Sequence, residues 1–251
     1  MTDIRIASWF GGLGDSLQFS TLPEEFHKQQ GRVSYIHAGS PFRNEEIKDL
    51  VWGANPYILG TQEGKRNAGD IPEIKYENTT NNGISNWEAL HGLRPTNKYP
   101  KIYYTPNKIP GLEDSFIADL TSISIDYDRA KLCQSLNAVE DRYSEKKTLH
   151  VQFSKPINSG GRETESTHGK FNNYHTGKED CIMIENLFHY CDVIFSAFGL
   201  IALSSGASHL SSAIKKYNPN LKSICLMNEK FHKIHKARGL FLFDNVEYLV
   251  H

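Results

Sequence analysis

Hydrophobic and polar residues in the first forty positions follow an order that predicts a strand, a glycine turn, a helix and a second strand. Residues 4–8 alternate and include two isoleucines, which is typical of a strand. The glycines at residues 11–14 end the strand, because clustered glycines favour backbone conformations that other residues avoid. Apolar residues then recur at near-helical spacing to residue 26, and residues 33–36 form the next apolar run. This order predicts a βαβ unit with a parallel sheet.

A similar order returns in the second half of the chain. Thr148–Phe153 and Ser223–Met227 are apolar runs that predict strands, and we expect another at Asp192–Phe198. Thr176 and Glu179 have the spacing of a capping box and precede apolar residues at helical spacing, so they predict a helix start.

Between these halves, residues 142–147 are charged, which suits an exposed linker. We therefore expect an α/β protein with two Rossmann-like domains, residues 1–145 and residues 146–251. We also expect helices at Ser40, where Ser-Pro favours a helix start, and at Asp128–Asn137. Residues 53–108 show little periodicity.

Composition excludes several classes of protein. The 251 residues carry 28 Lys and Arg against 29 Asp and Glu, without the basic excess that blanket binding to nucleic acid needs. Four cysteines lack the Cys-x-x-Cys spacing of a zinc site, and no apolar run is long enough to span a bilayer. A basic, apolar leader is absent, so we expect a soluble cytoplasmic protein.

The glycine turn is the first candidate site. A glycine-rich turn lets a ligand approach the backbone, and the following helix N-terminus favours anions. Gly12 and Gly14 fit neither the dinucleotide nor the P-loop pattern, and a plain tight turn stays open. Asp15 has two open roles, a general base facing a ligand or a residue that compensates the helix dipole.

The second candidate site is a serine and glycine turn at residues 204–209. Hydroxyls and a glycine ahead of a helix can hold an anion, and His209 would lie in the first helical turn. A serine helix cap with a structural histidine is the alternative. Basic residues after the Thr148–Phe153 strand, among them Lys155, could meet a diphosphate or simply lie in solvent.

The two turns together resemble glycosyltransferase family 9, the ADP-heptose heptosyltransferase group. GGLGDSLQFSTLPEEFHKQQGRVSYI is similar to the family's amino-terminal signature, and ALSSGASHLSSAI to its nucleotide-sugar signature. The resemblance implies a GT-B fold with a cleft between the domains, the acceptor on the side of residues 1–145 and the nucleotide sugar on the side of residues 146–251.

The resemblance also implies roles for single residues. Asp15 matches the catalytic base, and Gly12 and Gly14 match the loop that admits acceptor and donor. Lys155 is the candidate for the donor's phosphates, and the residues matching the nucleotide-sugar segment are Ser204, Ser205, Gly206 and His209. Expected partners are a nucleoside-diphosphate sugar and a glycan, lipid-linked or protein hydroxyl, without nucleic acid. No cofactor and no metal are expected, and peripheral membrane association stays open.

Two features keep other functions open. Ser204 stands where the family commonly has an acidic residue, and the chain is short for the family. An inactive sugar-nucleotide or glycan-binding module on the same scaffold is one alternative. A GT-B-shaped sugar-nucleotide epimerase, which would need no acceptor, is the other.

Overall fold

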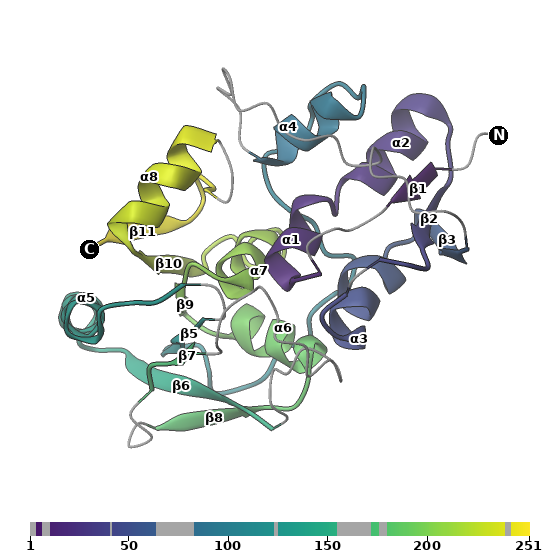
Figure 1. The fold of residues 1–251 in the computed structure, drawn as a ribbon. Helices are drawn as coiled ribbons and strands as arrows, with labels where there is room; N and C mark the ends of the chain where they lie inside the picture. Colours follow the sequence, from purple (N-terminus) through teal and green to yellow (C-terminus); the bar gives the residue numbers. More distant parts are fainter. Residues whose placement is uncertain are drawn as a thin grey trace. The chain divides into compact units, whose positions relative to one another are not determined.

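The computed structural model of the chain describes residues 4–6, 11–40, 42–63, 83–122, 125–154, 172–175, 180–238 and 242–251. The chain divides into two compact units, residues 1–104 with 235–243 and residues 105–234 with 244–251. Each unit holds a parallel β-sheet and helices (Figure 1).

The first unit carries a three-stranded parallel sheet in the order β1-β2-β3. Its elements are β1 (Ile4–Ile6), α1 (Leu13–Gln18), α2 (Leu22–Gln30), β2 (Ser34–His37), α3 (Glu45–Ile47), the π-helix η1 (Lys48–Gly53), β3 (Ile58–Gln62) and α4 (Gly83–Leu90). The predicted strand, glycine turn, helix and parallel strand are therefore confirmed. The predicted helix is divided in two, and α2 begins with Leu22-Pro23, where a proline fits the first helical turn.

The helix expected at Ser40 begins later, so that prediction is wrong. Residues 38–40, 42 and 43 stay outside a helix, because the Ser40 N–H donates to the His37 carbonyl and the Arg43 N–H donates to the Gly11 carbonyl. Asn44 caps α3 instead, and its side-chain oxygen accepts from the Ile47 N–H at 2.9 Å.

The second unit carries a six-stranded parallel sheet in the order β11-β10-β9-β4-β6-β8 and a short antiparallel pair, β5 with β7. Its elements are β4 (Ser115–Asp119), β5 (Thr121–Ser122), α5 (Arg129–Arg142), β6 (Lys147–Phe153), β7 (Asn172–Asn173), β8 (Cys181–Ile184), α6 (Leu187–Ser196), β9 (Gly199–Leu203), α7 (Gly206–Ile214), β10 (Lys222–Met227), α8 (Glu229–Arg238) and β11 (Glu247–Val250). The last residues of α8 belong to the first unit.

Both faces of the central strands in the six-stranded sheet are buried. Alternate residues of β4, β9 and β10 join one core cluster with α5, among them Phe116, Ile201 and Leu226. The residues between them, such as Ile117 and Leu200, are fully buried as well. Parallel sheets need this cover on both faces, which explains why these strands are continuous apolar runs without alternation.

The structure corrects one prediction for residues 176–198, and another lies outside the described residues. Asp192–Phe198, expected as a strand, lies mostly in α6, and the strand β9 begins directly after it at Gly199. Cys181–Ile184, before α6, form β8, which pairs with β6. The capping box expected at Thr176 and Glu179 lies outside the described residues, and α6 begins at Leu187 after its cap, Asn186. The apolar pattern fits either element, because a short apolar run does not distinguish a strand from a buried helix.

The expected domain boundary at residue 145 falls inside the second unit. β4 lies between β6 and β9 in the sheet, so the chain from residue 115 onward belongs with this unit. The charged residues expected to form a linker instead connect α5 to β6. Arg142 pairs with Glu247 and Lys146 with Asp114, which explains their charge.

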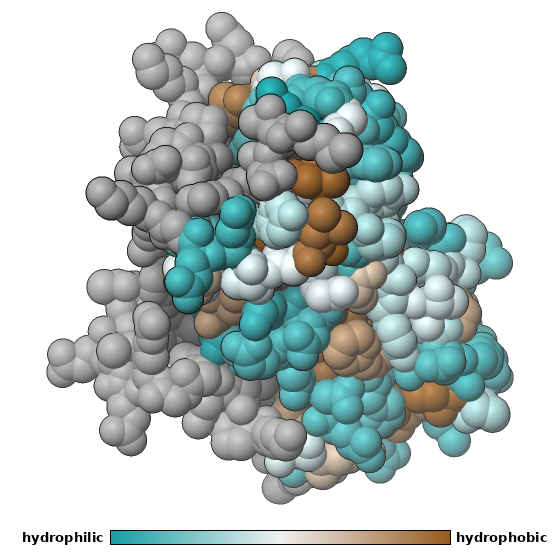
Figure 2. Space-filling view, turned by 90° about the vertical axis from the view of Figure 1, so that its right-hand side faces the viewer, coloured by the Kyte–Doolittle hydropathy of each residue, from teal (hydrophilic) through white to brown (hydrophobic). Residues whose placement is uncertain are grey.

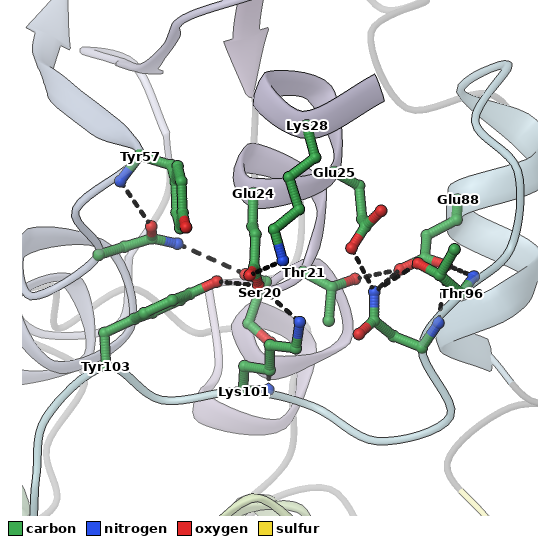
Figure 3. A network of polar contacts seen from close by, with 12 residues as sticks. Ser20, Thr21, Glu24, Glu25, Lys28, Tyr57, Glu88, Thr96, Lys101 and Tyr103 are labelled. Carbon is green, nitrogen blue, oxygen red and sulfur yellow. Dashed lines mark hydrogen bonds and ion pairs between the residues drawn. The ribbon is translucent and has the colours of Figure 1, made fainter. Parts of the chain in front are cut away.

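A polar network in the first unit, here called the Glu24–Glu88 network, ties residues 96–103 to α2 and α4 (Figure 3). The Glu24 carboxylate accepts from Lys28, Lys101 and Tyr103 at 2.5–2.9 Å. Glu88 is fully buried and accepts from the Thr21 hydroxyl and from residues 96 and 97. These buried carboxylates are thus satisfied by a segment that has no regular secondary structure of its own.

Few large hydrophobic side chains are exposed among the described residues. The exposed large hydrophobic residues are far apart in the sequence: Leu59, Leu90, Met183 and Val250. On the face in Figure 2, hydrophobic residues appear as separate spots among hydrophilic ones. None of the described helices is long and apolar enough to cross a membrane.

Glu24→Gln should destabilise the protein by about 1–3 kcal/mol at pH 6, the range for hydrogen bonds to a charged group. Burial alone would raise the pKa of Glu24, but hydrogen bonds from Lys101, Lys28 and Tyr103 outweigh it and hold that pKa at about 2. A lowered folded-state pKa contributes stability above the ordinary value of 4.5, and this contribution is lost as the pH falls toward 2. Urea unfolding should therefore show a smaller difference in the free energy of unfolding between Glu24→Gln and the unaltered protein at pH 3 than at pH 6.

Glu45→Gln is the matched control for this prediction. Glu45 pairs with Lys48 on an exposed helical turn, where ion pairs contribute little. If the loss of unfolding free energy in Glu24→Gln did not depend on pH, it would contradict the stabilising role of the ionised Glu24 carboxylate.

Candidate active site

The glycine turn of the first unit follows β1 and leads into α1. Gly11 has a backbone φ of 38°, in the left-handed region that favours glycine. Gly12 caps α1 in an extended conformation, and its carbonyl accepts from the Ser16 N–H at 2.9 Å. The loop after β2 joins the same turn, because the Arg43 N–H donates to the Gly11 carbonyl at 2.7 Å. Two neighbouring parallel strands thus contribute to one edge of the sheet, the edge at which α/β proteins bind ligands.

At Gly12 a side chain would fit only if the Asp15 carboxylate moved. A Cβ there would lie 2.8 Å from Oδ2 of Asp15 and 3.7 Å from Nη1 of Arg43. The first distance is shorter than a real Cβ contact, so an alanine would displace the carboxylate. The glycine therefore makes room for a carboxylate and a guanidinium beside the backbone.

Asp15 is the third residue of α1 and is partly buried. Burial raises the pKa of Asp15 from 3.8 to about 7, although the positive charge of Arg43 and the Gly12 N–H both lower it. A carboxylate with a pKa near neutrality suits a general base, because a substantial fraction is ionised near neutral pH and still accepts a proton readily. The same position also stabilises the helix N-terminus, so the two roles weighed from the sequence are compatible here.

The serine and glycine turn of the second unit follows β9 and leads into α7. Ser205 caps α7, and its hydroxyl accepts from the Ala207 N–H at 3.3 Å. The Ser204 N–H donates to the Tyr127 hydroxyl at 3.0 Å. Ser204, Ser205 and Gly206 are partly buried at the carboxyl end of a central strand.

His209 lies in the first turn of α7 and is almost completely buried. Its Nδ1 lies 2.9 Å from the Ser205 carbonyl oxygen, which can only accept, so Nδ1 carries the proton. In the neutral ring Nε2 is then an acceptor. The ring is thus oriented by the turn that it follows.

Within each unit the structure brings the sequence-predicted residues together. Gly12, Gly14 and Asp15 form one turn, and Ser204, Ser205, Gly206 and His209 form the other. Lys155 lies outside the described residues.

Arg43 was missed by reasoning from the sequence. It is six residues beyond β2, in a loop for which the sequence analysis expected a helix start. The sequence contained one signal for Arg43, its position soon after a predicted strand. The carboxyl ends of adjacent parallel strands meet at one edge of a sheet. A basic residue soon after the second strand therefore could have been placed near Asp15.

Comparisons of the sequence with known proteins found no match. No family model matches the chain, and no curated protein is similar to it in sequence.

Comparison of the structure with solved structures found proteins of the same fold. TibC of enterotoxigenic E. coli, described as a bacterial iron-containing dodecameric glycosyltransferase, matches with a TM-score of 0.58 and 13% identity over 89% of this chain. A glycosyl transferase family 9 protein from Veillonella parvula matches with a TM-score of 0.59 and 8% identity over 99% of this chain and 84% of its own. E. coli heptosyltransferase WaaC with ADP gives a TM-score of 0.54 and 8% identity, covering 99% and 93% of the two chains.

These likenesses confirm the α/β class that the resemblance to glycosyltransferase family 9 implied, while the two-domain arrangement with a cleft stays a prediction. The chain is an α/β protein with parallel sheets and has the fold of these glycosyltransferases. It spans 57% of the length of TibC.

The expectation that no metal is involved is corrected by the same comparison. TibC is described as iron-containing, so freedom from metal does not follow from this fold. In the part of the chain that the structure describes, no group of three or more His, Cys, Asp or Glu side chains could hold a metal ion. The described residues therefore do not fit an iron site.

Gly12→Ala should change the ionisation of Asp15 without unfolding the protein. The added Cβ would push the carboxylate away from its present surroundings of Arg43 and the Gly12 N–H. We expect the Asp15 pKa, followed by NMR titration of the carboxyl carbon, to move from about 7 by at least half a unit.

Gly53→Ala is the matched control, because a Cβ at Gly53 meets its nearest atom at an ordinary 3.7 Å. An unchanged Asp15 titration in Gly12→Ala would contradict the close approach of the carboxylate to Gly12.

Proposed function

We propose that this chain is a glycosyltransferase that moves a sugar from a nucleoside-diphosphate sugar to a hydroxyl group of an acceptor, with Asp15 as the general base. The observation that carries the proposal is the Asp15 carboxylate, which has a pKa of about 7 on a glycine turn at the ligand-binding edge of a parallel sheet. The shared fold with heptosyltransferases and a family 9 protein supports the class of reaction.

The proposed reaction is a single displacement at the anomeric carbon of the donor sugar. The acceptor oxygen forms a bond to this carbon while the bond from the carbon to the phosphate oxygen breaks. The bonding electrons leave with the nucleoside diphosphate, and the acceptor's proton moves to the Asp15 carboxylate. The configuration at the anomeric carbon is inverted.

The two units take different parts in this proposal. The first unit presents the base to the acceptor, and the second holds the donor near Ser204, Ser205, Gly206 and His209, with Lys155 as a further contact to the phosphates. ADP-heptose is the first donor to test, because TibC was solved with ADP-D-β-D-heptose and WaaC with ADP. A glycan, a lipid-linked sugar or a protein hydroxyl can serve as the acceptor in this chemistry.

Asp15→Asn should reduce sugar transfer by about 10²–10⁴-fold, the contribution typical of a general base. An amide has nearly the same shape but cannot take the proton. ADP binding, measured by isothermal titration, should stay within about twofold, since Asp15 is not among the proposed donor contacts. Transfer is followed as ADP released from ADP-heptose with a core oligosaccharide or a serine-containing peptide as acceptor.

Asp49→Asn, an exposed carboxylate of the same unit, is the matched control. Transfer that survives Asp15→Asn would contradict the role of the base. ADP-heptose binding without turnover in the unaltered chain would favour an inactive binding module, and donor conversion without acceptor would favour an epimerase.

The pH dependence of transfer should reveal the unusual pKa of Asp15. The base is active when ionised, so kcat/KM should rise with pH through about 7 and level off above it. The raised pKa also means that the ionised carboxylate costs stability, a cost absent below the ordinary value of 3.8 and complete above about 7. Asp15→Asn should therefore have a higher melting temperature than the unaltered protein at pH 8. An acid limb of kcat/KM near pH 4 would contradict the raised pKa of Asp15.

A further inference from the structure

The space beside Gly12 is bordered by two side chains of opposite charge. The Asp15 carboxylate enters it from the first turn of α1, and the Arg43 guanidinium enters it from the loop after β2. The bond from the Arg43 N–H to the Gly11 carbonyl fixes the backbone of that loop to the turn. The backbone that carries each side chain is therefore anchored at the glycine turn: that of Arg43 through Gly11, and that of Asp15 through α1, which begins after Gly12.

These two described side chains do not pair directly. No nitrogen–oxygen distance between them is within the 4.0 Å of an ion pair. Their distances to the Cβ position of Gly12 are 2.8 Å for Oδ2 and 3.7 Å for Nη1, so the two atoms are at most 6.5 Å apart. A gap of more than 4.0 and at most 6.5 Å thus separates the Asp15 carboxylate from the Arg43 guanidinium.

The Arg43 guanidinium donates no hydrogen bond to any of the described residues, although it is partly buried. A guanidinium has five N–H donors, and shielding them from water without an acceptor is unfavourable. Burial lowers the pKa of Arg43, and the nearby charge of Asp15 acts in the opposite direction. A guanidinium stays protonated in proteins, so Arg43 is a cation. An oxygen atom from a ligand would satisfy these donors.

The gap has the size that one hydroxyl group spans. A hydroxyl oxygen accepts from a guanidinium N–H at about 2.9 Å and donates to a carboxylate at about 2.7 Å. With a bond angle near tetrahedral at that oxygen, the two partners lie about 4.6 Å apart. A single acceptor hydroxyl can therefore contact both side chains at once.

We propose that Arg43 is a second catalytic residue, which donates a hydrogen bond to the acceptor oxygen while Asp15 takes the proton from that oxygen. The inference rests on the proposed function. As the oxygen attacks the anomeric carbon, negative charge develops on it before the proton has moved fully to Asp15. The guanidinium stabilises this charge and keeps its own proton throughout, so the transfer needs no further reactant.

The test compares Arg43→Gln and Arg43→Lys with the unaltered chain, and Arg94→Gln serves as the matched control. Arg94 is an exposed guanidinium of the same unit. ADP release from ADP-heptose is measured with whichever of the two acceptors the unaltered chain uses. We expect Arg43→Gln to lower kcat by about 10²–10³-fold, as for the loss of one donor to a developing oxyanion, with the KM for ADP-heptose within about twofold.

Two further readouts separate a catalytic role from a structural one. Arg43→Lys keeps the charge and should recover at least tenfold of the lost kcat. The acid limb of kcat/KM should move upward in Arg43→Gln but not in Arg43→Lys, because the positive charge lowers the pKa of Asp15.

The outcomes distinguish this inference from the function on which it rests. Transfer that Asp15→Asn abolishes and Arg43→Gln leaves intact would overturn the role of Arg43 alone. A loss of kcat in Arg43→Gln that Lys does not restore, with an unmoved acid limb, would also overturn it. If the unaltered chain transfers no sugar to either acceptor, the proposed function and this inference fall together.

Discussion

The absence of a side chain at Gly12 is the constraint on which the candidate site depends. It lets the Asp15 carboxylate lie beside the backbone, where burial raises its pKa to about 7, and it leaves room for the guanidinium of Arg43. A side chain at Gly12 would force the Asp15 carboxylate to move. Because the Arg43 N–H donates to the Gly11 carbonyl, the loop that carries the guanidinium is anchored to the same turn as Asp15.

The two units share one local arrangement, a strand, a turn of small residues and a helix, but its polar groups differ between them. In each, a parallel strand ends in small residues and a helix begins at once, β1 with α1 and β9 with α7. In the first unit the small residues make room for charged groups. In the second, Ser205 caps the helix and orients His209 through its carbonyl, so the polar groups are arranged by hydrogen bonds within the turn. We expect the first arrangement to act on a proton and the second to hold an anion.

Reasoning from the sequence predicted the elements that neighbouring residues in the chain determine. The strand, glycine turn and helix at residues 4–30 follow from glycine and apolar spacing, and Asp128 caps α5 as its sequence indicates. Reasoning from the sequence was wrong where the pairing of strands determines the structure. Cys181–Ile184 is a strand because β6 lies beside it, and residues 115–119 belong to the second unit because β6 and β9 flank them. Arg43 joins the candidate site through a contact to Gly11 that no short sequence pattern records.

The order of strands in the six-stranded sheet has a consequence for how the chain is made. β4 lies at the centre, yet its partner β9 follows only after α5, β6, β8 and α6. During synthesis, one edge of β4 must therefore wait without a partner until most of the second unit has left the ribosome. Pairings this distant in sequence slow folding and leave strand edges open to association with other chains. The open edge of β4 is therefore most exposed to such association while the chain between β4 and β9 is being made.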